Sequence, residues 1–510
     1  MKRTYLVLAF LLSAVFCQGQ EKGFFENPVI RGDMADPSII RIGDDYYATG
    51  TSSEWAPYYP LYKSRDMVNW KQVGHVFDTK PEWTSNSFWA PELFCHEGKV
   101  YCYYTARQKS TGISYIGVAV ADSPEEGFTD CGPVVTFGNE AIDAFVFEDK
   151  GELYISWKAY GLDKRPIELL CSRLSDDGLR MEGEIFSLLK DDQRIGMEGQ
   201  CIFRHGEYYY LIYSAHSCCG RASDYDVYVA RSTDFKGPYE KFGGNPILHG
   251  GIGDFQSCGH GTVVTAPDGR MFYLCHAYLA GDGFCTGRQP VMHELEITGD
   301  GWPRFKTGSV AMKIQSAPFK GTVQKVEDEF HDSFNGKELK KEWSWNYTYA
   351  DISAALEGGS LILSGTPLAG NMYGTALCVR AQEPDFVFEA GIGQTDRELK
   401  GLTLYGDSGN MAVWGYRDGK LVMDVIMDGK ETVLFSTPWE GPAHLRMAVD
   451  AGTVTGIWWS RDGKEWHSPE NLSLDVTGLE RWDRVQRPGL IYCGGPDGNA
   501  EFSYFTISYR

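Results

Sequence analysis

One short pattern occurs five times in the N-terminal part of this chain. In each copy a polar residue precedes a short apolar segment, a glycine-containing turn follows, and an aromatic-rich segment runs back. The clearest copy begins at Glu198, turns at Gly206 and returns through residues 208–213. Alternating segments joined by a tight turn are typical of a β-hairpin. The chain is therefore predicted to contain five similar hairpins, each with a polar residue at its start.

The five polar residues recur at nearly regular distances along the chain. Their numbers differ by 56, 51, 55 and 62, and the residues are Asp36, Glu92, Asp143, Glu198 and His260. Blades of known propellers repeat at roughly 40 to 50 residues. Because the innermost strand of each blade starts at the central channel, a five-bladed β-propeller would bring the five side chains together. The alternative is that each polar residue only caps its own strand.

Length and composition narrow the choice of function. With 510 residues the chain exceeds one ordinary domain, and 29 Tyr and 14 Trp supply a large apolar core. The net charge of −21 disfavours nucleic acid and anionic membrane surfaces as partners. Many aromatic rings with excess carboxylates instead suit a neutral, hydroxyl-rich ligand such as a sugar. The oligomeric state is left open.

Four regions are expected. Residues 1–19 combine two basic residues, an apolar run and small polar residues, which predicts a secretory signal peptide and a secreted or periplasmic protein. A lipid anchor at Cys17 is disfavoured, because Phe16 is bulky where a lipoprotein signal needs a small residue. Residues 23–315 form the predicted propeller, 316–325 a linker, and 326–510 a second all-β domain, read as a β-sandwich. No insertion into a membrane is expected.

The cysteines do not resemble a small disulfide framework. We expect buried free thiols; the alternative is a disulfide, whose pairing the sequence leaves open, among Cys218, Cys219, Cys258 and Cys285.

The ordered motifs resemble glycoside hydrolase family 43. They are Ala-Asp-Pro-Ser at 35–38, Trp-Ala-Pro-Glu at 89–92, Ile-Asp at 142–143, Glu-Gly at 198–199, Gly-His-Gly-Thr at 259–262 and Gly-Arg at 287–288. The resemblance implies a five-bladed propeller that hydrolyses arabinose-, xylose- or galactose-containing polysaccharides with inversion of configuration. The C-terminal region is similar to the concanavalin-like domain of many β-xylosidases and arabinofuranosidases. Ala144 and Phe145 depart from the family pattern after the third-blade aspartate.

The resemblance also assigns roles to three carboxylates. Asp36 is the general base, Glu198 the general acid, and Asp143 the group that orients the acid and adjusts its pKa. Inverting hydrolysis needs an acid and a base about 6.5 to 9.5 Å apart, which suits residues on blades one and four. Because Glu198 must be protonated near neutral pH, we expect burial and the charge of Asp143 to raise its pKa.

Five further residues are candidates around these acids. Trp89 offers a ring face to a sugar or packs in the core, and Trp55 is placed at the pocket rim. Arg288 is expected to contact a sugar hydroxyl or a catalytic carboxylate. Glu92 joins the polar ring as a substrate contact or a structural acceptor. No cofactor is required, but the resemblance implies a calcium ion near His260, held through water because a lone histidine is a poor calcium ligand.

Three function classes follow. The first is a secreted, exo-acting inverting β-xylosidase or α-L-arabinofuranosidase, or a galactan-directed enzyme of the same fold. The second is a retaining fructan-cleaving enzyme, disfavoured because its Asn-Asp-Pro-Asn-Gly motif is absent. The third is a sugar-binding propeller without catalysis, disfavoured because all three acids are present.

Overall fold

The computed structural model describes residues 23–159, 166–368, 370–393, 396–494 and 497–510. Its first domain consists of five four-stranded antiparallel sheets, one of which carries an additional short strand. The blades, in chain order, are β2 (Ser38–Ile42), β3 (Asp45–Thr49), β5 (Tyr58–Ser64) and β6 (Lys71–Phe77); β7 (Trp89–His96), β8 (Lys99–Arg107), β9 (Ser114–Ala121) and β10 (Thr129–Val135); β11 (Ala141–Asp149), β12 (Glu152–Ala159), β13 (Glu168–Arg173) and β14 (Phe186–Lys190); β15 (Glu198–His205), β16 (Tyr208–Ala215), β17 (Asp226–Ser232) and β18 (Glu240–Lys241), with β19 (Leu248–His249) beside β17; and β20 (Phe255–Thr265), β21 (Met271–Leu279), β22 (Arg288–Ile297) and β23 (Pro303–Phe305).

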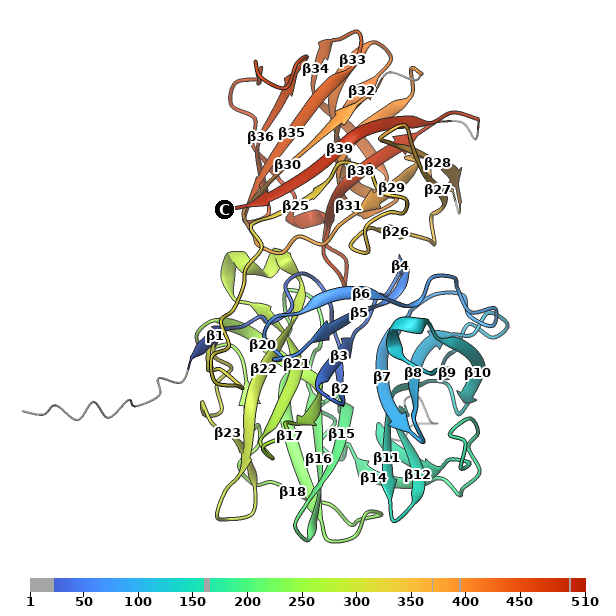
Figure 1. The fold of residues 1–510 in the computed structure, drawn as a ribbon, viewed down its shortest axis with the longest axis vertical. Helices are drawn as coiled ribbons and strands as arrows, with labels where there is room; N and C mark the ends of the chain where they lie inside the picture. The colour runs from blue at the N-terminus through green and yellow to red at the C-terminus, as the bar shows by residue number, and fades with distance from the viewer. Residues whose placement is uncertain (1–22, 160–165, 369, 394–395, 495–496) are drawn as a thin grey trace, which may run out of the picture.

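The five innermost strands close a ring. Strand β2 contacts β7, β7 contacts β11, β11 contacts β15, β15 contacts β20, and β20 contacts β2 again. Each inner hairpin turns at a glycine with φ between +61° and +84°. This backbone conformation is unfavourable for residues that have a side chain. The hairpins predicted from the sequence are therefore the inner halves of the five blades, and the predicted five-bladed propeller is confirmed (Figure 1).

The second domain is a sandwich of two eight-stranded sheets. One sheet runs β27 (Ala350–Glu357), β28 (Ser360–Pro367), β39 (Ala500–Tyr509), β30 (Phe386–Ile392), β35 (Ala443–Asp450), β36 (Thr453–Ser460) and β37 (Leu474–Asp475), with β25 (Glu329–Asp332) beside β39. The other runs β34 (Lys430–Pro438), β33 (Lys420–Met427), β32 (Asn410–Arg417), β31 (Leu399–Asp407), β38 (Arg487–Cys493), β29 (Thr375–Cys378), β26 (Ser344–Asn346) and β4 (Trp55–Ala56). The predicted sandwich is confirmed.

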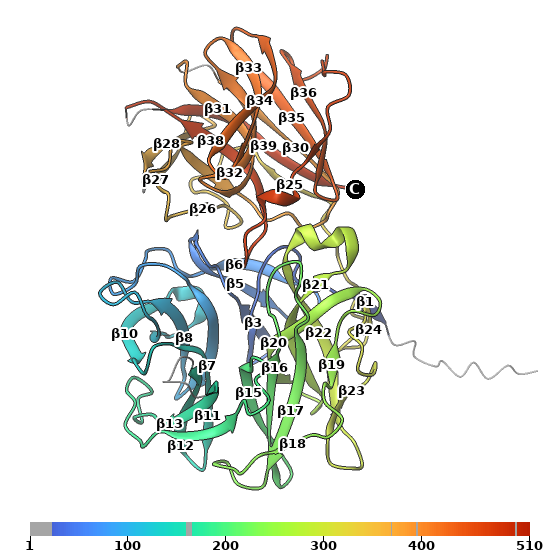
Figure 2. The ribbon, with the colours of Figure 1, turned by 180° about the vertical axis from the view of Figure 1, so that it is seen from behind.

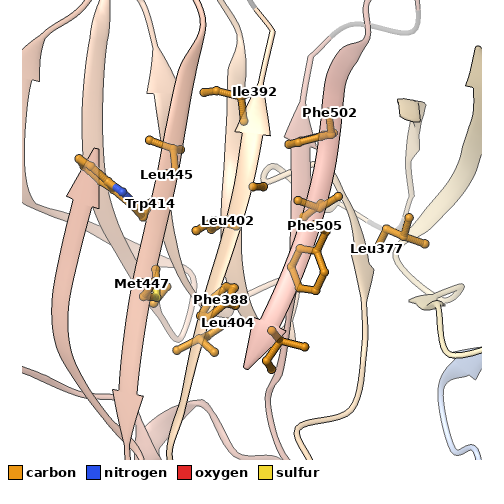
Figure 3. Close-up of a cluster of buried hydrophobic side chains, with 14 of the residues drawn as sticks. Leu377, Phe388, Ile392, Leu402, Leu404, Trp414, Leu445, Met447, Phe502 and Phe505 are labelled. Carbon is orange, nitrogen blue, oxygen red and sulfur yellow. The ribbon is translucent and has the colours of Figure 1, made fainter. Parts of the chain in front are cut away.

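Apolar side chains from both sheets fill the space between the layers of the sandwich. Alternate residues of each strand point inward, as the period of a strand requires. Figure 3 shows part of this core, with Phe388, Leu402, Trp414, Leu445 and Phe505 between the strands; all five are fully buried. Such a core stabilises the sandwich as a unit of its own.

Strand β4 belongs to the propeller chain but completes a sheet of the sandwich. Trp55 pairs with Asn346 and Ala56 with Trp345 across antiparallel β4 and β26. Figures 1 and 2 show the sandwich on one end of the propeller, and Figure 1 shows β4 and β26 at the junction. The sandwich is thus joined to the first blade by backbone hydrogen bonds as well as by the linking segment.

Few elements lie outside these sheets. Strands β1 (Phe24–Glu26) and β24 (Ile314–Ser316) pair at the edge of the propeller, and no strand lies between β24 and β25. Short 3₁₀ helices occur at Pro124–Glu126, Gly281–Thr286 and Thr477–Leu479. No helix in the described part of the chain is long and apolar enough to cross a membrane. The predicted signal peptide lies outside the described residues.

The cysteine prediction is partly wrong. The structure joins the neighbours Cys218 and Cys219 in a disulfide, whereas Cys258 and Cys285 are buried free thiols.

Candidate active site

Every blade has the same backbone distortion, in its innermost strand or just before it. One residue in each takes a left-handed conformation, with φ of +52° at Asp36, +33° at Ala90, +58° at Asp143, +59° at Gly199 and +46° at His260. In four of the blades the pairing register also shifts there, as at a β-bulge. A bulge redirects a side chain, and at Asp143 and His260 the distorted residue itself carries the polar side chain. Asp36 has the left-handed backbone without a register shift.

This register corrects the sequence-based alignment of the five polar residues. Glu198 lies one residue before the distorted position and Glu92 two residues after it. The positions two residues after it in the first and fifth blades are Ser38 and Thr262, and both donate hydrogen bonds to Oε2 of Glu92, at 2.7 and 3.4 Å. Glu92 is only 5% exposed. Its contacts are those of a structural acceptor, one of the two expected roles, and a contact with substrate stays a prediction.

The other four polar residues form one cluster, which we call the carboxylate cluster: Asp36, Asp143, Glu198 and His260. Nδ1 of His260 lies 3.4 Å from Oδ1 of Asp36 and 3.9 Å from Oδ2 of Asp143. The backbone N–H of Gly199, beside Glu198, donates to Oδ2 of Asp143 at 3.3 Å. A Cβ on Gly199 would come within 2.7 Å of the His260 ring, so glycine is required at this close approach. The propeller thus brings together residues of four separate blade strands.

Asp36 is held as a carboxylate. Burial by itself raises its pKa, but the charge of Arg288 and the nearby rings of His260 and His276 outweigh burial, so the pKa lies far below its usual range. Nη1 of Arg288 is 3.7 Å from Oδ1, and the hydroxyl of Thr51 donates to Oδ2 at 2.6 Å. The backbone N–H of Asp36 donates to Nδ1 of His276 at 3.0 Å. These contacts suit a group that accepts a proton from water.

The pKa of Asp143 is shifted in the opposite direction, upward. Burial is the main cause, and the negative charge of Glu198 adds to it; His260 and Lys158 oppose both, and the pKa is raised to about 7. Its two backbone polar groups are also engaged: the N–H donates to Thr105 at 3.2 Å, and the carbonyl accepts from the side-chain amide of Gln200. The Asp143 side chain can therefore hold a proton near neutral pH.

The expected rise in the pKa of Glu198 is wrong. Burial does act in that direction, but the pKa is lowered because Nζ of Lys158 lies 2.6 Å from Oε2 and the Tyr225 hydroxyl donates to Oε1 at 2.9 Å. Both oxygens thus accept hydrogen bonds, which stabilises the carboxylate. Of the two neighbouring acids, Asp143 rather than Glu198 carries the raised pKa.

Sequence reasoning missed Lys158, Tyr225, His276 and Thr51. The hairpin pattern contained one usable signal: β12 runs antiparallel to β11 and pairs Lys158 with Ile142, next to Asp143. His276 likewise pairs with Gly259, next to His260. Thr51 and Tyr225 lie outside the predicted strands, and their distance from the acids depends on loop paths.

The other three predicted contact residues lie in different surroundings. Arg288 lies at Asp36, as stated, and is 3% exposed. Trp89 is partly exposed, and its ring meets that of Trp482 from the sandwich edge-on, with centroids 6.4 Å apart. Trp55, placed at the rim from sequence, is 1% exposed in β4 beneath the guanidinium of Arg487. The prediction for Trp55 is wrong because the loop that carries it is built into the sandwich.

The surroundings of His260 do not fit a calcium shell. Calcium takes six to eight oxygen ligands. In the described part of the chain, no group of three or more His, Cys, Asp and Glu side chains is arranged to hold a metal ion. The carboxylates that face His260 are engaged by Thr51 and by the backbone N–H of Gly199. The calcium ion stays a prediction.

Comparison with known proteins agrees with this geometry. The family "Glycosyl hydrolases family 43" matches residues 25–303, and "Beta xylosidase C-terminal Concanavalin A-like domain" matches residues 331–507. A non-reducing end alpha-L-arabinofuranosidase of Bacteroides ovatus is 27% identical over 446 residues, covering 82% of this chain and 81% of its own. A beta-xylosidase of Bacillus subtilis is 29% identical over 339 residues, covering 60% and 62%.

The fold is also found among solved structures. That of a xylan beta-1,4-xylosidase from Bacillus halodurans superposes with a TM-score of 0.81 at 21% identity, covering 95% of this chain and 100% of its own. The first-domain match extends over more than half of the chain and includes every residue of the carboxylate cluster. The chain belongs to glycosyl hydrolase family 43 and is an inverting glycoside hydrolase with a C-terminal concanavalin-like domain.

Proposed function

We propose that this protein is an exo-acting glycosidase that removes terminal α-L-arabinofuranosyl or β-xylosyl residues from plant polysaccharides or oligosaccharides. Asp36 is the general base and Glu198 the general acid. The observation that carries the proposal is the cluster of three carboxylates with different proton affinities: Asp36 stays ionised, whereas burial raises the pKa of Asp143, beside Glu198, to about 7. Acid and base roles follow from pKa values that are pushed apart.

In the proposed mechanism Asp36 takes a proton from the water that attacks the anomeric carbon. Glu198 gives a proton to the glycosidic oxygen on the opposite face of the sugar, and the bond to the leaving group breaks. Asp143 lies beside Glu198 and supplies the proton that the pair holds. Oε2 of Glu198 faces the ammonium group of Lys158 and Oε1 faces the hydroxyl of Tyr225, so one of these two contacts has to give way to the glycosidic oxygen.

The choice of sugar rests on relatives. The matched relatives are named as an arabinofuranosidase and a beta-xylosidase, and the C-terminal match carries a beta-xylosidase description. A galactoside substrate and sugar binding without catalysis are the alternatives. We also propose that the protein is exported, because residues 1–19 have the pattern of a signal peptide.

The test is a panel of nitrophenyl glycosides (α-L-arabinofuranoside, β-xyloside and β-galactoside) with the wild-type protein, Asp36→Asn and Glu198→Gln. Each variant should lose about a hundredfold to ten-thousandfold in turnover while its melting temperature stays close to that of the wild type. NMR of the first-formed anomer should show inversion. Activity retained by either variant would refute its assigned role, and no turnover of any glycoside by the wild type would leave only a sugar-binding protein.

A further inference from the structure

The general base is connected to the sandwich through a loop of the first blade. Thr51 donates to Oδ2 of Asp36 at 2.6 Å, and its hydroxyl also accepts the backbone N–H of Ala90 at 2.8 Å. Four residues later the same loop becomes strand β4 and pairs with β26 of the sandwich. The position of one hydrogen-bond donor to the base thus depends on a segment held by the other domain.

An acidic residue of the sandwich, Asp483, reaches this loop. Asp483 lies between the last 3₁₀ helix and β38 and is 6% exposed. Its Oδ2 accepts from the hydroxyl of Ser53 at 2.7 Å, and its Oδ1 accepts from Nη1 of Arg484 at 2.6 Å. Its carboxylate therefore fixes the loop two residues away from Thr51.

The backbone of Asp483 holds the second group that faces the base. Nη2 of Arg288 donates to the carbonyl oxygen of Asp483 at 2.9 Å, while Nη1 lies 3.7 Å from Oδ1 of Asp36. Nε of Arg288 is buried and has no hydrogen-bond partner among the described residues. The direction of the guanidinium is consequently set by Asp483 at one end and by Asp36 at the other.

We propose that Asp483 is a positioning residue for the reaction: it holds Arg288 and the Thr51 loop against Asp36, so that the sandwich is required for the function of the general base. This proposal rests on the assignment of Asp36 as the base. It gives the C-terminal domain a role inside the catalytic step, which a domain that only bound polymer would not have.

The charged groups around the base decide the direction of the expected effect. The groups that face Asp36 from the packed elements are His260 of β20, His276 of β21 and Arg288 of β22, with Asp143 of β11 and Tyr225 of the loop before β17 further away. Around Arg288 lie Asp33, whose Oδ1 accepts its backbone N–H at 3.0 Å, and Tyr278. Arg288 is the cation that lowers the pKa of Asp36 most.

The experiment compares Asp483→Ala, Asp483→Asn and Ser53→Ala with the wild type by kcat and KM across pH on the best nitrophenyl glycoside. Asp483→Ala keeps the backbone carbonyl that Arg288 bonds but removes the acceptor of Ser53 and Arg484, so the segment that holds Arg288 and the Thr51 loop can shift away from Asp36. The pKa of Asp36 should then rise toward its usual range, and the fall of kcat/KM on the acid side should move to higher pH than in the wild type. We expect kcat to drop by up to about a hundredfold with little change in KM. Asp483→Asn keeps an acceptor for Ser53 and should recover part of the loss.

The matched control is Glu383→Gln, which removes another contact between the domains, the ion pair of Glu383 with Arg31. It should leave both kcat and the pH profile unchanged. Ser53→Ala deletes one hydroxyl and serves where Asp483→Ala does not fold. A wild-type kcat in folded Asp483→Ala and Ser53→Ala would overturn the proposal, as would an equal effect of Glu383→Gln. If the proposed role of Asp36 is itself incorrect, Asp36→Asn would instead keep the turnover of the wild type.

Discussion

Nζ of Lys158 lies 2.6 Å from Oε2 of Glu198, and both side chains are largely buried. The pair joins the end of β12 to the start of β15, in two neighbouring blades. It keeps the proposed general acid ionised in the free enzyme, while the neighbouring Asp143 has its pKa raised to about 7. The proposed mechanism therefore requires that a proton held at Asp143 reaches Glu198 when substrate binds.

Removing the cation should shift the alkaline side of the pH profile. In Lys158→Met, burial is no longer opposed by an ammonium group, so the pKa of Glu198 rises. The pair then keeps its proton to higher pH, and the decline of kcat/KM at alkaline pH should move upward by about one to three units. The measurement is kcat/KM from pH 4 to about 10. Lys150→Met, on an exposed lysine, is the control; equal profiles for Lys158→Met and wild type would contradict the proposed control of the acid.

Replacing Asp143 by asparagine should shift the alkaline side of the pH profile to lower pH. The negative charge of Asp143 works against ionisation of Glu198, and with asparagine in its place Lys158 acts unopposed. The pKa of Glu198 then falls further, and the activity of Asp143→Asn should be lost at lower pH than that of the wild type. Because the two variants are predicted to move in opposite directions, a shift of both to the same side would refute the account of the pair.

Glu92 should make the stability of the protein depend on pH. Burial raises its pKa from 4.5 to about 8, in spite of hydrogen bonds from Ser38 and Thr262. The folded state thus binds a proton that the unfolded chain has released. The resulting stabilisation is complete below about pH 4.5 and is lost as the pH rises to about 8.

The test for Glu92 uses the isosteric variant Glu92→Gln, which has no proton to lose. The melting temperature of the wild type minus that of the variant should decrease between pH 5 and pH 8 and level off above it. Activity at neutral pH should stay near the wild-type value, because Glu92 lies behind the carboxylate cluster. A difference that does not change with pH would show that Glu92 is ionised throughout.

Trp482 should contribute to substrate binding without contributing to folding. It is 64% exposed, yet its ring contacts that of Trp89. Trp89 precedes Ala90, whose backbone N–H donates to the hydroxyl of Thr51. An exposed aromatic ring offers its face to a sugar. Trp482→Ala should raise KM for oligosaccharides more than for nitrophenyl monosaccharides, with stability changed by no more than about 0.5 kcal/mol.

Met372→Ala, at another exposed apolar residue of the sandwich, is the matched control for Trp482 and should leave KM unchanged. A KM unaltered in Trp482→Ala for every substrate length would remove this ring from the binding site.

The strand pattern allowed much of the fold to be predicted. Hairpins with alternating residues and a turn glycine depend on neighbours in the chain, so the five repeats could be recognised and the acids assigned to their starts. The sequence pattern is less accurate about which residues of the five strands lie in the same layer. It places Glu92 with Asp36, because a bulge shifts the register by one or two residues without changing the hydrophobic pattern.

The sequence by itself determined the propeller, the sandwich and the residues Asp36, Asp143 and Glu198, since local periodicity and short motifs carry that information. Only the tertiary structure decided which charges face them: the lysine that ionises Glu198 and the arginine held by Asp483. It also decided that Trp55 is buried in a sheet of the other domain. These contacts join segments up to several hundred residues apart, and the pKa of a buried carboxylate depends on distances of a few ångströms that no spacing along the chain encodes.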